Sequence, residues 1–128
     1  MALELEITPS KQHSKRISLS GALDSNTAPD LQHAIDASID MEIRTVILEM
    51  QELKFISSAG LRVIFKLKKE LTGRDGQLLM VHLQPQVRKV FEVITAVSNM
   101  HVFASLEELD EYLASIQKQV TDDNNSLQ

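Results

Sequence analysis

Residues 51–71, QELKFISSAGLRVIFKLKKEL, place two adjacent serines and a glycine between an apolar dipeptide and a long amphipathic run. After the serines, apolar residues recur at the spacing of one helical face, at Leu61, Ile64, Leu67 and Leu71. Before them, the β-branched run 44–50 does not alternate with polar residues, which is typical of a strand covered on both faces. The stretch therefore predicts a buried strand, a serine loop (residues 57–60) and a helix.

Further elements are predicted on both sides of this stretch. Period-2 patterns predict strands at 2–8 and 16–24, and a change to helical spacing follows within 26–40. Downstream we expect a buried strand at 77–83, a helix from Pro85, an edge strand at 100–104 and a helix capped by Ser105 and Glu108. The order β-β-α-β-α-β-α-β-α indicates an α/β fold, with a mixed sheet of four to five strands, helical crossovers and about four helices. One domain is expected over 1–120, with a flexible polar tail at 121–128.

Composition narrows the classes of function. The chain has 128 residues, no cysteine and a formal net charge of −5. The N-terminal residues do not match a signal peptide, and no apolar run is long enough to cross a membrane. An acidic chain without a basic, aromatic-rich stripe is not expected to bind nucleic acid. We therefore expect a cytoplasmic protein whose partners are proteins or small molecules, with no role at a membrane.

Motifs for catalysis and metal binding are weak. His33, flanked by Asp30 and Asp36, offers only a poor surface metal site, and phosphate-binding glycine loops are missing. The serine loop partly matches the G-x-S-x-G turn of serine hydrolases, with Ser58 as the nucleophile. However, Ile56 stands where that turn needs its first glycine. We expect no catalytic residues, no metal and no cofactor.

The start of the helix after the serine loop has free hydrogen-bond donors. Either Ser57 or Ser58 can cap this helix, but only one can do so. The residues three positions after the serines are Gly60 and Leu61. No glutamate or glutamine side chain is therefore placed to accept a hydrogen bond from the free amides, as in a capping box. These amides and the helix dipole favour an anion, and a phosphate on the second serine fits there. Thr27 is similarly predicted to cap the helix within 26–40.

Two motifs carry a resemblance to a known family. KFISSAGLRVIFKLKKEL, residues 54–71, resembles the signature loop of STAS-domain anti-sigma factor antagonists. LSGALDSNTAPDL, residues 19–31, is similar to the G-x-L-D and T-A-x-x-L motif of the same family. The spacing of the motifs and the order of predicted elements agree with that family over residues 3–118.

The resemblance implies a phosphorylation switch in partner choice. The unmodified protein would bind an anti-sigma factor that is also a GHKL-type serine kinase, and phosphorylation of the loop serine would release it. A PP2C-type phosphatase would reverse the reaction. The phosphorylated residue corresponds to Ser58, and Asp24 matches an acidic residue near the loop. Gly60 matches a glycine that allows close approach of the helix start, and Ser57, Ala59, Leu61 and Arg62 complete the predicted partner-binding loop.

Two loop positions differ from the family pattern. Ser57 replaces an aspartate before the phosphorylated serine, and Ala59 replaces a hydroxyl residue after it. Ser57 is therefore a second candidate acceptor, a helix cap or a hydrogen-bond donor to Asp24, although Ser58 is favoured for phosphorylation. The exchange of the aspartate also supports an alternative function, a non-switching STAS scaffold or accessory subunit of a transporter or signalling assembly.

The predicted helix also carries a basic face, at Arg62, Lys66 and Lys69. This face would either meet an acidic partner surface beside the serine loop or simply be solvated, and the pattern favours the solvated face.

Overall fold

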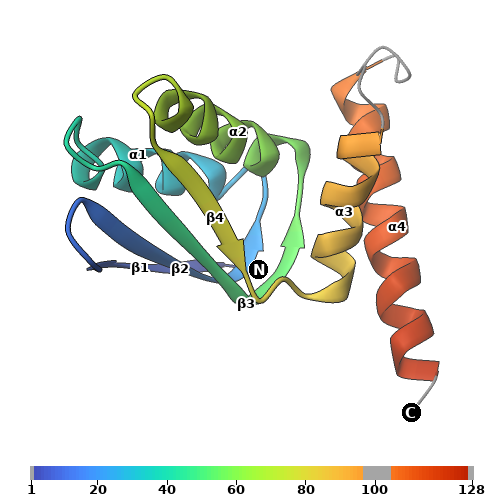
Figure 1. The fold of residues 1–128 in the computed structure, drawn as a ribbon. Helices are drawn as coiled ribbons and strands as arrows, with labels where there is room; N and C mark the ends of the chain where they lie inside the picture. Colours follow the sequence, from blue (N-terminus) through green and yellow to red (C-terminus); the bar gives the residue numbers. More distant parts are fainter. Residues whose placement is uncertain (1, 97–104, 127–128) are drawn as a thin grey trace.

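The computed structural model describes residues 2–96 and 105–126. Its elements are β1 (Leu3–Pro9), β2 (Ser14–Leu23), α1 (Ala28–Ser38), β3 (Thr45–Ile56), α2 (Ser58–Thr72), β4 (Gln77–Val81), α3 (Pro85–Ala96) and α4 (Leu106–Ser126) (Figure 1). The predicted order of these elements is confirmed. The edge strand predicted at 100–104 lies outside the described residues.

The four described strands form one mixed sheet in the order β1-β2-β3-β4. β1 and β2 are antiparallel neighbours, whereas β2, β3 and β4 run parallel to one another. Parallel neighbours need a crossover, and α1 and α2 supply the two crossovers here. The predicted mixed sheet with helical crossovers and four helices is thus confirmed.

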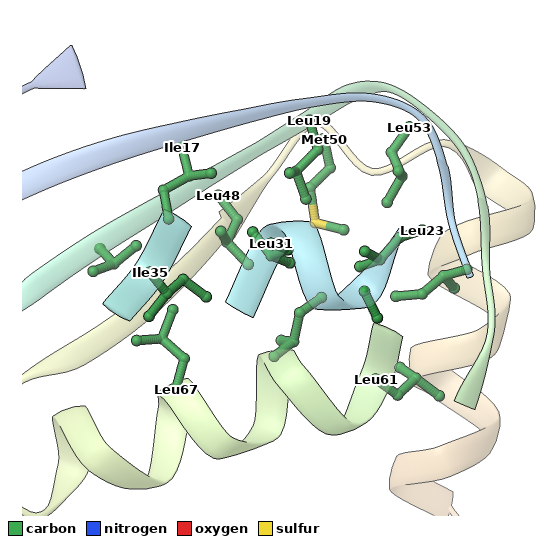
Figure 2. Close-up of a cluster of buried hydrophobic side chains, with 14 of the residues drawn as sticks. Ile17, Leu19, Leu23, Leu31, Ile35, Leu48, Met50, Leu53, Leu61 and Leu67 are labelled. Atoms are coloured by element: carbon green, nitrogen blue, oxygen red, sulfur yellow. The ribbon is translucent and has the colours of Figure 1, made fainter. Parts of the chain in front are cut away.

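The core lies between one face of the sheet and the helices α1 and α2. Figure 2 shows side chains of β2, β3, α1 and α2 pointing toward one another. They are Ile17 and Leu19 from β2, Leu48 and Met50 from β3, Leu31 and Ile35 from α1, and Leu61 and Leu67 from α2. All eight are buried. The amphipathic pattern that predicted α2 follows from this packing, since its buried positions recur every three or four residues.

The two predicted buried strands are less buried than expected. In β3, Val46, Leu48 and Met50 are buried, but the alternate positions such as Ile47 are only half-buried. In the described sheet β4 is an edge strand, and its Leu79 is 41% exposed. The expectation of cover on both faces was wrong because α1 and α2 pack on the same face.

Helices α3 and α4 lie side by side near the carboxyl end of β3 (Figure 1). The Ser105 hydroxyl accepts a hydrogen bond of 3.1 Å from the Glu108 amide, as the predicted cap requires. α4 continues past Val120 to Ser126, into the residues predicted to form a tail, and the extent of the domain stays a prediction. No helix of the described residues is both long enough and apolar enough to span a bilayer.

Candidate functional site at the start of α2

The serine loop lies where β3 ends and α2 begins, beside the carboxyl end of β2. The Ser57 amide donates a hydrogen bond of 2.9 Å to the Leu23 carbonyl. Gly60 packs directly on Leu23: a Cβ atom added at Gly60 would lie 2.6 Å from Leu23 Cγ and 3.0 Å from the Leu23 oxygen. The start of α2 can therefore approach β2 this closely only because residue 60 has no side chain.

Neither serine uses its side chain to cap α2. Ser57 occupies the N-cap position without a side-chain cap bond, and its buried hydroxyl has no hydrogen-bond partner. Ser58 is the first residue of the helix. Ser57 and Ser58 are only 7% and 8% exposed. Of the alternatives for Ser57, the N-cap position is confirmed, but its side chain forms neither a capping hydrogen bond nor one to Asp24.

The anion at the start of α2 is a carboxylate of the protein itself. The Ser58 amide donates a hydrogen bond of 2.8 Å to Oδ1 of Asp110, which lies on α4. A carboxylate at this position satisfies a free amide and interacts favourably with the helix dipole. The expectation that all the first amides of α2 are unclaimed is therefore corrected. Sequence reasoning missed Asp110 because it is 52 residues from Ser58 along the chain.

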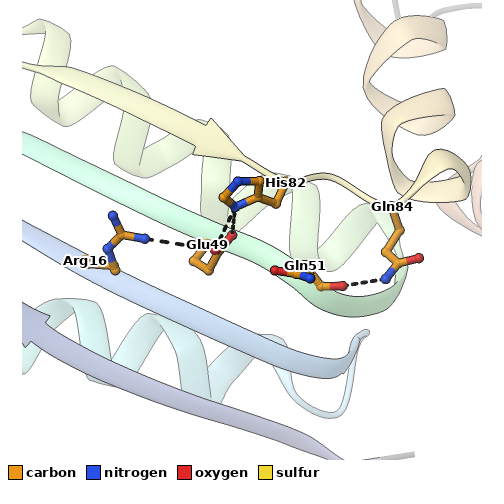
Figure 3. Close-up of polar contacts among 5 residues, drawn as sticks. All are labelled: Arg16, Glu49, Gln51, His82 and Gln84. Atoms are coloured by element: carbon orange, nitrogen blue, oxygen red, sulfur yellow. Dashed lines mark hydrogen bonds and ion pairs between the residues drawn. The ribbon is translucent and has the colours of Figure 1, made fainter.

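Glutamine side chains cover the part of β3 that extends beyond its pairing with β4. β4 pairs with β3 only from Thr45 to Glu49. Beyond this point the Gln51 carbonyl accepts a hydrogen bond from Gln84 (Figure 3), and the Lys54 carbonyl accepts one of 3.0 Å from Gln86. Gln117 of α4, which is buried, bonds to both the amide and the carbonyl of Ile56. These contacts attach α3 and α4 to the strand that ends in the serine loop.

Asp24 shapes the adjacent turn between β2 and α1. Its Oδ1 accepts hydrogen bonds from the Asn26 amide at 2.9 Å and the Thr27 amide at 3.1 Å. Thr27 occupies the N-cap position of α1 as predicted, but its side chain does not bond to the helix, because its hydroxyl donates to the Ala22 carbonyl and accepts from the Asp24 amide. No hydrogen bond joins Asp24 to either serine in the described part of the chain. Asp24 therefore orders the loop next to the serines without a hydrogen bond to either of them.

A hollow of about 400 Å³ begins at Ser58 and follows α2. We call it the α2 hollow. Its apolar lining comes from Leu61, Phe65, Ile94 and Leu109, and its charged lining from Arg62, Lys66 and Lys69. Phe65 is 39% exposed and packs edge-on against Phe91, with ring centroids 6.3 Å apart. Among the described residues the three cations form no ion pair. The predicted basic face therefore borders the same hollow as these apolar side chains.

The remaining predicted loop residues take different places. Leu61 is buried in the core and reaches the floor of the α2 hollow, whereas Arg62 is exposed at its edge. Ala59 is half-buried against the core.

The outer face of the sheet carries a separate polar cluster. Glu49 contacts His82 Nδ1 at 2.7 Å through its Oε1, and the same oxygen lies 4.0 Å from Arg16 (Figure 3). Glu49 stands between the buried Leu48 and Met50, so its side chain points away from α1 and α2. In the described ranges, no three or more metal-ligating side chains are grouped so that they could hold a metal ion. His33, Asp30 and Asp36 do not form such a group either.

Comparison with known proteins identifies the family. A model of the STAS domain matches residues 7–109, which is more than half of the chain. The chain belongs to the STAS domain family. The resemblance inferred from the two motifs is thereby confirmed, and the STAS fold explains the four-stranded mixed sheet and its two helical crossovers.

Relatives of this STAS chain include anti-sigma factor antagonists. A Bordetella bronchiseptica protein named as anti-sigma factor antagonist BtrV is 40% identical over 75 residues, which are 59% of this chain. The chain spans 65% of that relative's length. An anti-sigma factor antagonist of Mycobacterium paratuberculosis has a similar structure, with a TM-score of 0.67 and 21% identity over 91% of this chain and 95% of that one.

The anti-sigma factor antagonist SpoIIAA shares the fold in two forms. Its unphosphorylated form gives a TM-score of 0.60 and 21% identity, over 76% of this chain and 100% of that one. The phosphorylated Bacillus form gives a TM-score of 0.61 and 22% identity, over 70% and 82%. At these identities the likeness concerns the fold alone.

Proposed function

We propose that this STAS protein is a cytoplasmic anti-sigma factor antagonist that acts by partner switching and has no catalytic activity. Unmodified, it binds an anti-sigma factor that is also a GHKL-type serine kinase. Phosphorylation of Ser58 releases this partner, and a PP2C-type phosphatase restores binding. The name of the Bordetella bronchiseptica relative and the two loop motifs support this role.

The observation that carries the proposal is the position of Ser58 at one end of the α2 hollow. An apolar floor with a cationic edge suits an acidic partner surface that also presents apolar side chains. A phosphate on Ser58 adds a charge of about −1.5 to −2 beside this surface. It would repel acidic partner groups and compete with them for Arg62. A loss of about 4 kcal/mol would weaken binding about a thousandfold.

Ser58 is the better acceptor of the two serines. Both are nearly buried, but Ser58 lines the α2 hollow whereas Ser57 does not. The Ser57 hydroxyl is enclosed without a hydrogen-bond partner. A phosphate on Ser57 would therefore disturb the packing between β2 and α2, whereas one on Ser58 would lie next to the α2 hollow.

A pull-down with matched variants tests the switch. Ser58→Asp and Ser58→Asn differ in charge but hardly in size, and each is used as bait in lysate of the source cell. We expect a kinase-like protein, identified by mass spectrometry, to bind the wild type and Ser58→Asn and to be lost from Ser58→Asp. Retention of the same proteins by both variants would contradict partner switching and favour a non-switching scaffold.

A further inference from the structure

Helix α4 is attached to the end of β3 and to the serine loop by two polar side chains. Asp110 accepts the hydrogen bond from the Ser58 amide, and Gln117 bonds to the amide and carbonyl of Ile56. The two residues are seven positions apart, so they lie on the same face of the helix, together with the buried Leu113. With α4 in this position, Ser58 is only 8% exposed.

The carboxylate of Asp110 occupies the amino-terminal end of α2, where a phosphate on Ser58 would also be stabilised. Oδ1 of Asp110 lies 2.8 Å from the backbone nitrogen of the same residue that would carry the phosphate. The start of α4 also carries Glu107, Glu108 and Glu111. Two anions a few ångströms apart repel strongly where burial reduces screening by water. Asp110 and a phosphate on Ser58 are therefore competitors for one helix end.

We infer that α4 is a phosphorylation-sensitive cover of the serine loop. Phosphorylation of Ser58 expels Asp110 from the start of α2, and α4 then moves away from Ile56. The phosphate takes the helix end and gains Arg62, which lines the same hollow. Movement of α4 also removes Leu109 from the wall of the α2 hollow, so the surface proposed for partner binding loses its shape. This inference rests on the proposed phosphorylation of Ser58.

Hydrogen exchange of single amides measures this movement without any partner. The Ile56 amide bonds to the Gln117 side chain, and the Ser58 amide bonds to Asp110, so both report whether α4 is in place. Four variants separate charge from size: Ser58→Glu and Ser58→Gln, each in the wild-type and in the Asp110→Asn background. Asparagine keeps an oxygen that can accept the Ser58 hydrogen bond, but it removes the negative charge.

With Asp110 present, we expect these two amides to exchange about tenfold faster in Ser58→Glu than in Ser58→Gln, an effect of about 1.4 kcal/mol. In the Asp110→Asn background the two variants should exchange at similar rates. The amide of the buried Leu48 serves as the reference for global opening. Equal rates for glutamate and glutamine with Asp110 present, or the same difference in both backgrounds, would overturn the inference.

Substitution of a nearly buried serine can prevent folding, so a second comparison keeps Ser58 intact. Asp110→Ala should accelerate exchange at Ile56, whereas Glu107→Ala, an equal charge change at an exposed position of the same helix, should not. Unchanged exchange at Ile56 in Asp110→Ala would also overturn the cover.

The result is distinguishable from failure of the proposed function. If the exchange rates show charge coupling between residues 58 and 110 but Ser58→Asp still binds its partner, partner switching is rejected. The inference that α4 covers the serine loop is then retained. Loss of the partner without this coupling would retain the switch and reject the cover.

Discussion

The side-chain amide of Gln117 forms with Ile56 the two hydrogen bonds that a neighbouring parallel strand would otherwise provide. Its Oε1 accepts from the Ile56 amide at 2.9 Å, and its Nε2 donates to the Ile56 carbonyl at 2.8 Å. Gln117 is 2% exposed, so water does not replace these bonds. The carboxyl end of β3 is thus completed by a side chain of α4.

Gln117→Leu should therefore destabilise the protein. Leucine leaves the buried amide and carbonyl of Ile56 without partners, which costs roughly 2–4 kcal/mol in the free energy of unfolding. Urea denaturation followed by circular dichroism measures this loss. Gln119→Leu, at an exposed position of the same helix, is the control and should change stability by less than about 0.5 kcal/mol. Equal stability of the two variants would show that the Gln117 contacts are not needed.

Gly60→Ala should destabilise the start of α2. The added methyl group would lie 2.6 Å from Leu23 Cγ and 3.0 Å from the Leu23 carbonyl oxygen, so the fully buried Leu23 would have to shift. Such overpacking costs about 1–3 kcal/mol. Gly73→Ala is a matched control, because its Cβ would meet only the Lys69 oxygen at 3.4 Å and the Glu70 oxygen at 3.6 Å. Thermal unfolding should show a clearly lower Tm for Gly60→Ala alone, and a tolerated Gly60→Ala would contradict the close approach.

Phe65→Ala should weaken partner binding more than it weakens the fold. The ring lines the α2 hollow but is 39% exposed, so only part of its packing energy supports stability. An apolar anchor of this size commonly contributes more than about 1.4 kcal/mol to an interface, or tenfold in Kd. Leu79→Ala on β4 removes a similarly exposed side chain away from the hollow. Calorimetric titration with the partner found in the pull-down should show weaker binding only for Phe65→Ala, and unaltered affinity would exclude the hollow as the interface.

Lys66→Glu should slow association with an acidic partner. Lys66 lies at the cationic edge of the α2 hollow and forms no ion pair in the described structure. Reversing an interface charge acts mainly on the association rate and its salt dependence. Lys89→Glu on α3 changes the net charge equally at an exposed position outside this hollow. Stopped-flow measurements at about 50 and 200 mM salt should show a reduced rate and a weaker salt dependence for Lys66→Glu only. Identical kinetics for both variants would support a merely solvated basic face.

Local patterns in the sequence predicted most of the fold. The change from strand-like to helical spacing at the serines placed β3 and α2, because each periodicity reflects which residues face the core. The same patterns did not show that α1 and α2 share one face of the sheet, so the burial of β3 and β4 was overestimated. Thr27 was assigned to capping because threonine suits that role, but its hydroxyl bonds within the preceding turn instead.

The sequence by itself determined the order of the elements and the two serines at the start of a helix, and its family resemblance pointed to the glycine at position 60. The first two features depend on residues that are close together along the chain. The third depends on a close approach that only glycine tolerates. The tertiary structure decided what surrounds the serines. Asp110 and Gln117 reach the loop from 52 and 61 residues away, where no periodic pattern connects the partners. Their roles arise only when α4 packs against the end of β3, because a carboxylate and an amide elsewhere on that helix would simply be solvated.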